Sequence, residues 1–157
     1  MRRGGFSLFL VLGLASASAH AEGQVGVGIV AGDPTGFTLK SRFTPMHALQ
    51  LHVGIGIGRF DNGRLTLVAD YLIHADQLFK DVSGSGFLVP YAGLGAKLGL
   101  RESSVDPVAL AARVPIGVAF LFRKTPLELF GEVAIGIHAL PAVAPLIDGG
   151  IGLRWYF

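Results

Sequence analysis

Apolar residues recur at every second position along most of the chain, and a period of two is typical of β-strands. In the stretch 48–58, Leu, Val and Ile alternate with Gln, His and Gly. The length of each run is close to the roughly 9–11 residues that a tilted transmembrane strand needs. The pattern predicts eight strands, at about 24–31, 37–43, 48–58, 64–74, 87–100, 113–122, 127–138 and 149–157.

Residues that favour turns separate these runs. Asp33-Pro34-Thr35-Gly36 has Pro and Gly where a β-turn prefers them, and Asp61-Asn62-Gly63 accepts the positive φ of a hairpin turn. We expect longer connections at 75–86, 101–112 and 139–147. The last is rich in Pro and Ala and is apolar for a solvated loop. It is expected to pack over the barrel mouth, to meet lipid or to bind a hydrophobic ligand, and simple packing is the favoured interpretation.

The first 21 residues have the layout of a secretory signal peptide. Arg2 and Arg3 precede the apolar stretch 6–15, and Ala19-His20-Ala21 forms a small-residue cleavage site. The apolar stretch is shorter than the roughly 20 residues of a membrane-spanning helix. We therefore expect residues 1–21 to be removed and residues 22–157 to form one domain.

The composition narrows the fold class. The chain is 51% hydrophobic and 15% charged, with no cysteine and a mean hydropathy of +0.56. Without Arg2 and Arg3 the basic and acidic residues balance at 11 each, so no basic field points to nucleic acid. No later apolar run is long enough for a spanning helix, and only helices and closed barrels span a membrane. We predict an all-β, closed, antiparallel up-and-down transmembrane barrel of about eight strands. A soluble exported barrel is the alternative.

Glycines indicate which face of each strand points inward. Glycine weakens a strand, but it leaves room in an eight-stranded barrel that is only just wide enough for its side chains. The strand glycines share the face that carries the charges: Gly54, Gly56, Gly58, Gly93, Gly95, Gly117, Gly136 and Gly152. We therefore expect the charged face to line the lumen and the aliphatic face to meet lipid.

Two groups of side chains follow from this assignment. The first is a polar network that fills the lumen: Lys40, Arg42, His52, Asp70, His74, Tyr91, Lys97, Arg113, Glu128, Glu132 and Arg154. Because charges kept from bulk water need partners, we expect ion pairs, with Arg113 within reach of both glutamates. The second is an aromatic girdle at the periplasmic end, made of Phe43, Phe122, Trp155 and Phe157.

The C-terminal segment Gly150-Ile151-Gly152-Leu153-Arg154-Trp155-Tyr156-Phe157 resembles the last strand of bacterial outer-membrane proteins. The mature chain also resembles a family of small, largely uncharacterised outer-membrane barrels, similar to the barrel domains of OmpA- and OmpX-type proteins. The similar stretches are 32–36, 69–74, 90–95, 113–117 and 127–134. The resemblance implies an eight-stranded barrel in the outer membrane, and it implies that Ile151, Leu153, Trp155 and Phe157 are an assembly signal. It implies no established activity.

The residues favour a structural or membrane-integrity role with a charged, filled lumen. A narrow pore or hydrophobic-ligand conduit is one alternative, and surface recognition by the outer loops is another. A lipid-modifying enzyme is the least favoured, because Ser83, Ser85, Ser103 and Ser104 fall in connections without a neighbouring base. His52 and His74 lack the spacing of a metal site. We expect no enzyme activity, no cofactor, no metal and a monomer. Its expected partners are outer-membrane lipid and the barrel assembly machinery.

Overall fold

The computed structural model describes residues 25–75, 80–82, 84–102 and 106–157. The signal peptide expected at 1–21 lies outside these residues. The described residues form nine strands: β1 (Val25–Gly32), β2 (Thr35–Arg42), β3 (His47–Ile55), β4 (Leu65–His74), β5 (Lys80–Val82), β6 (Gly86–Leu100), β7 (Val108–Phe122), β8 (Leu127–Leu140) and β9 (Ala144–Tyr156). Among the described residues, no helix is long and apolar enough to cross a membrane.

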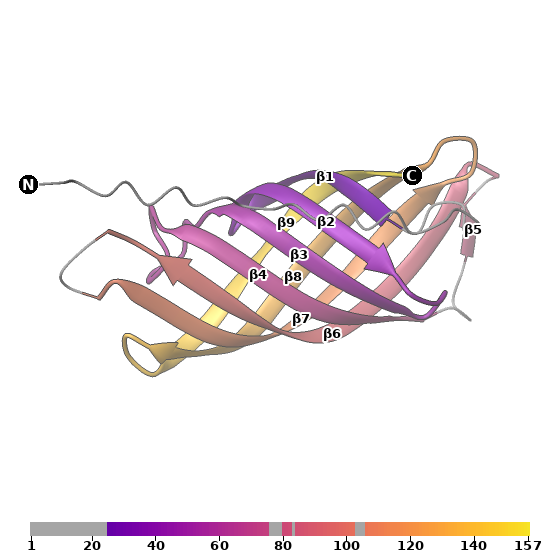
Figure 1. Cartoon of the computed structure of the whole chain (residues 1–157). Coiled ribbons are helices and arrows are strands. Elements are labelled where there is room, and N and C mark those ends of the chain that lie inside the picture. The colour runs from indigo at the N-terminus through magenta and orange to yellow at the C-terminus, as the bar shows by residue number, and fades with distance from the viewer. Residues whose placement is uncertain (1–24, 76–79, 83, 103–105) are drawn as a thin grey trace, which may run out of the picture.

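The strands form one closed antiparallel barrel (Figure 1). Strands β1 to β4 pair in sequence order, as do β6 to β9, and the barrel closes because β1 pairs with β9 and β4 pairs with β6. Eight strands therefore make the wall, while the short β5 pairs only with β6. The predicted all-β, up-and-down barrel of eight strands is confirmed. The short turns 43–46 and 123–126 lie at the same end as the C-terminus, which we call the turn end (Figure 1). The turns 33–34 and 141–143 lie at the opposite end.

Two predicted connections were too long. The connection 101–112 ends earlier, because β7 begins at Val108. The apolar loop expected at 139–147 is mostly strand, because β8 continues to Leu140 and β9 begins at Ala144. Within it Leu146 is 4% exposed and Ile147 is 77% exposed, so the alternation of the strand continues there. Its prolines and alanines conceal this alternation in the sequence. Strand β3, conversely, ends at Ile55 rather than at 58.

The barrel has a polar interior and an aliphatic outer wall. Side chains such as Ile29, Leu94 and Ile151 point outward and are 62%, 68% and 66% exposed, whereas Lys40 and Arg154 are 0% exposed inside. The small apolar cluster in the interior consists of Val30, Ala48, Leu72, Tyr91, Ala119 and Phe130.

Glycine makes room for close strand contacts and for large interior side chains. A Cβ on Gly28 would lie 1.7 Å from the backbone oxygen of Leu153 on the neighbouring β9. A Cβ on Gly152 of β9 would lie 2.4 Å from the ring of Phe130 and 2.5 Å from the backbone oxygen of Ile29 on β1. The closure between β1 and β9 therefore depends on glycine at both strands.

Candidate functional site: the charged interior

One carboxylate near the turn end binds three cations. Glu128 on β8 accepts hydrogen bonds from Lys40 Nζ at 3.2 Å, Arg42 Nη2 at 2.9 Å and Arg154 Nη1 at 2.6 Å. The hydroxyl of Tyr156 donates a fourth bond at 2.8 Å. Lys40, Glu128 and Arg154 are fully buried. We call these five residues the Glu128 cluster.

The opposite end reverses this arrangement, since one cation meets three carboxylates. Lys97 Nζ lies 2.9 Å from Asp33 Oδ2, 3.0 Å from Asp61 Oδ2 and 3.1 Å from Asp148 Oδ2. Asp33 and Asp61 come from connections that fold inward, and Asp148 comes from β9. We call these four residues the Lys97 cluster.

Arg113 links the two clusters in the middle of the barrel. Its guanidinium pairs with Glu132, with Asp70 Oδ1 at 3.3 Å and with Asp148 Oδ1 at 3.0 Å. Gln50 continues the chain, because its amide donates to Glu132 at 2.8 Å and its carbonyl accepts from Arg154 at 2.5 Å. A continuous polar network therefore crosses the barrel from end to end.

The interior balances its charge overall but not locally. The ion pairs join six carboxylates to five cations, and the buried Arg64, whose Nε donates to the backbone oxygen of Phe60, is a sixth interior cation. The Glu128 cluster has an excess of positive charge, and the Lys97 cluster has an excess of negative charge. Opposite charges in a low-dielectric interior stabilise each other only with good hydrogen-bond geometry. Glu128 accepts hydrogen bonds from all three of its cations. At the opposite end Lys97 donates a hydrogen bond to Asp148 and is held to Asp33 and Asp61 as ion pairs.

Aromatic rings fill the space beside the ion pairs. The Arg154 guanidinium lies 3.6 Å from the centroid of Phe130, and the Lys40 ammonium lies 5.1 Å from that of Tyr91. Phe130 is 2% exposed. A small cavity beside Phe130, bordered by His52 and Arg113, has a volume of about 10 Å³. That is about the room one water needs.

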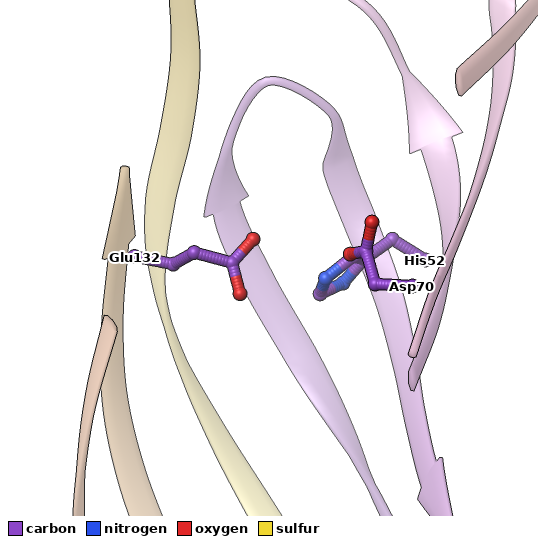
Figure 2. Close-up of side chains that lie close together, drawn as sticks. All are labelled: His52, Asp70 and Glu132. Atoms are coloured by element: carbon purple, nitrogen blue, oxygen red, sulfur yellow. The ribbon is translucent and has the colours of Figure 1, made fainter. Parts of the chain in front are cut away.

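His52, Asp70 and Glu132 offer a group of possible metal ligands within 4.8 Å of one another. Figure 2 shows His52 and Asp70 side by side, facing Glu132 across the lumen. His52 Nδ1 is buried without a hydrogen-bond partner. Arg113, however, already pairs with both carboxylates. A divalent cation would therefore have to displace a guanidinium, and the group is better described as an arginine-bridged acid pair.

The structure places the eleven residues of the predicted polar network inside the barrel, but it divides them differently from the expected pairing. Arg113 reaches Glu132 but not Glu128, which the Glu128 cluster holds. Tyr91 donates to Glu132 at 3.1 Å. His74 lies against the Tyr91 ring, with the centroids 5.5 Å apart. Lys97 is paired with Asp33, Asp61 and Asp148, which lie outside the predicted network.

The missed members of the network are Asp33, Asp61, Asp148, Gln50, Tyr156 and Thr38, whose hydroxyl accepts from Arg154 Nε at 3.0 Å. Asp33 and Asp61 occupy turn sequences, and the residue type alone does not say that a turn carboxylate folds inward. Asp148 fell between the predicted connection 139–147 and the strand predicted at 149–157, whereas β9 already begins at Ala144. Gln50 and Tyr156 could have been found, because both lie on the same strand face as predicted members, Gln50 beside His52 and Tyr156 beside Arg154.

The aromatic residues of the predicted girdle all lie at the turn end and point outward. Phe43, Phe122, Trp155 and Phe157 are 56%, 37%, 47% and 74% exposed. Ile151 and Leu153 of the predicted assembly signal share the outer face of β9, at 66% and 40% exposed. The role of either group is a prediction from the sequence.

No family model matches the chain, and comparisons with curated proteins and with solved structures found no match. The closed barrel is thus known from the chain's own geometry, and the resemblance to small outer-membrane barrels rests on the sequence motifs.

Proposed function

We propose that the protein is a small outer-membrane barrel whose role is structural, with a lumen closed by its own ion pairs. The observation that carries the proposal is the polarity of the wall. Aliphatic side chains cover the outside, while lysine and arginine side chains are fully buried inside. Soluble monomers rarely expose contiguous apolar patches above a few hundred Å². A closed barrel pairs every strand edge, which lipid requires.

The filled interior favours a structural role over a pore. The lumen is filled by large side chains that are at most 2% exposed, among them Glu128, Arg154 and Phe130. An eight-stranded barrel is just wide enough for such side chains. Water and ions would have to separate the Arg113 pairs to pass.

The outer membrane is supported by the sequence. The signal-peptide layout at 1–21, the C-terminal Phe157 and the resemblance to small outer-membrane barrels all favour export and assembly there. On this proposal the barrel assembly machinery inserts the chain as a monomer, with the turn end in the periplasm. The outward aromatics at that end, Trp155 among them, would then lie at the periplasmic interface.

Three measurements on the full chain expressed in a Gram-negative host test the proposal. The protein should appear in the outer-membrane fraction, and its unboiled form should migrate differently on a detergent gel from its boiled form. In planar bilayers it should conduct negligibly. A soluble periplasmic protein would refute the membrane assignment, whereas discrete channels from a membrane-inserted protein would refute the closed lumen.

A further inference from the structure

The outer wall of the barrel has a groove with a volume of about 1220 Å³. It crosses β4, β6, β7 and β8, and its border includes outward aliphatic side chains such as Ile73, Leu94, Ile116 and Val133. These four residues are 48%, 68%, 57% and 59% exposed. The groove is therefore an apolar recess in the wall rather than part of the lumen.

Two small outward-facing residues produce the recess. The strand register places Ala92 between Ile73 and Ile116, and it places Gly131 between Val118 and Ile151. Ala92 on β6 and Gly131 on β8 therefore lie on either side of β7, and each has larger side chains on the neighbouring strands.

Gly131 differs from the other glycines in the described strands. A Cβ there would meet only Ile151 Cγ2, at 3.8 Å, which is ordinary contact. At each of the other described strand glycines, a Cβ would lie within 2.8 Å of another atom. Glycine weakens a strand, and packing does not require it at residue 131. Its effect on the structure is to leave the recess open.

The strand pairing is interrupted beside this recess. Between β6 and β7 the register runs from Gly86 to Ala92 and resumes at Gly95 without a shift. Pro115 faces the gap and has no N–H to donate. Tyr91 and Glu132, which face the lumen, also border the groove. The floor of the groove therefore reaches side chains that also line the lumen.

Polar atoms lie where the groove reaches the turn end. Met46 and Ala75 border it there. The Tyr71 hydroxyl lies 2.9 Å from His47 Nδ1, and the Tyr71 side chain is 44% exposed. An apolar groove with polar atoms at one end is complementary to an amphipathic molecule that carries a hydrocarbon chain.

We propose that this groove binds an acyl chain of a diacyl phospholipid, with the headgroup at the turn end beside Tyr71 and His47. The proposal rests on the membrane location proposed above. A second copy of the barrel fits less well, because its convex aliphatic wall would touch the rim and leave the recess around Gly131 empty. Among the described residues, the outward-facing part of the lining carries no ionised side chain that would pair with a protein partner.

Native mass spectrometry tests the proposal with the full-length protein extracted from outer membranes. The protein is released from detergent micelles that contain palmitoyl-oleoyl-phosphatidylethanolamine, and the retained lipid adducts are counted. The test variant is Gly131→Leu, which fills the recess without a backbone clash. The matched control is Ala31→Leu, because Ala31 is an outward-facing residue of β1, which does not border the groove.

We expect the wild type and Ala31→Leu to retain one lipid. Gly131→Leu should retain it about tenfold less, which corresponds to about 1.4 kcal/mol of binding free energy. All three proteins should show the same heat-dependent gel shift, which establishes that the barrel is folded. Equal retention by the three folded proteins would refute the lipid site, as would a dimer that Gly131→Leu abolishes. A protein that needs no detergent would instead refute the membrane proposal.

Discussion

The Glu128 cluster supports a quantitative prediction. Glu128→Gln keeps the size of the side chain but removes the charge that faces Lys40, Arg42 and Arg154. Breaking a buried pair from one side costs about 3–5 kcal/mol, because it leaves an uncompensated buried charge. Glu128 is 0% exposed and holds three cations. Arg42 keeps some solvent contact, with its side chain 20% exposed. We therefore expect a loss of about 4 kcal/mol in the free energy of unfolding.

The assay is urea unfolding of the refolded protein in phospholipid vesicles, followed by the fluorescence of its one tryptophan, Trp155. Lys124→Met is the control, because Lys124 lies in the exposed turn 123–126 and its removal should cost below about 0.5 kcal/mol. The double variant Glu128→Gln with Lys40→Met should recover about 1–2 kcal/mol, because it removes one of the unpaired cations. A loss below about 1 kcal/mol for Glu128→Gln would refute the view that this carboxylate stabilises the barrel.

Three further changes test the lumen, the wall and the strand closure. Lys97→Met should lower the free energy of unfolding by about 3–5 kcal/mol in the same assay. This loss should persist in about 1 M NaCl, because salt screens buried ion pairs only weakly. A loss that salt abolishes would argue for a hydrated lumen. Ile29→Arg, midway along β1, should lower the free energy of unfolding in vesicles by about 2–4 kcal/mol. Val25→Arg, near the rim, should lower it by about 0–1 kcal/mol. Equal and negligible losses for the two variants would indicate a barrel in water. Gly28→Ala should remove the heat-shifted gel band, because its Cβ would lie 1.7 Å from the Leu153 backbone oxygen; a normal gel shift would show that the strands can separate there.

The strand pattern made most of the wall predictable. A shift of one residue exchanges the two faces of a strand, so the clear alternation in β3 and β4 determined both the strands and their inward side chains. The register then follows from short turns between neighbouring strands. The sequence predicted that the barrel closes, but it did not predict the register in which β1 pairs with β9. That pairing joins residues from opposite ends of the chain, such as Gly26 and Tyr156.

The partners of individual charges were not predictable. Lys40 and Glu128 are 88 residues apart, and they meet only because the barrel closes in one particular register. The same holds for Lys97, which is paired by two turn carboxylates and by Asp148. Alternation identifies the face of a side chain, but it says nothing about its height relative to side chains across the lumen. The expected contact between Arg113 and Glu128 is wrong for this reason.

The proposed route of the chain to its membrane gives a physical reason for so many buried charges. An aliphatic interior could pack equally well, and replacing buried ion pairs by apolar residues often stabilises a protein. Such a chain, however, would have two successive strands that read as about 20 continuous apolar residues, the length of a membrane-spanning helix. It would be held in the inner membrane during export. A polar residue at every second position prevents this, because a charged side chain strongly disfavours insertion of a helix. Once the barrel closes, the buried charges need partners. Glu128 pairs with three cations and Lys97 pairs with three carboxylates, so few residues are needed to pair them. On this argument the network makes an exportable sequence compatible with a closed barrel, and a site for chemistry is not needed to explain it.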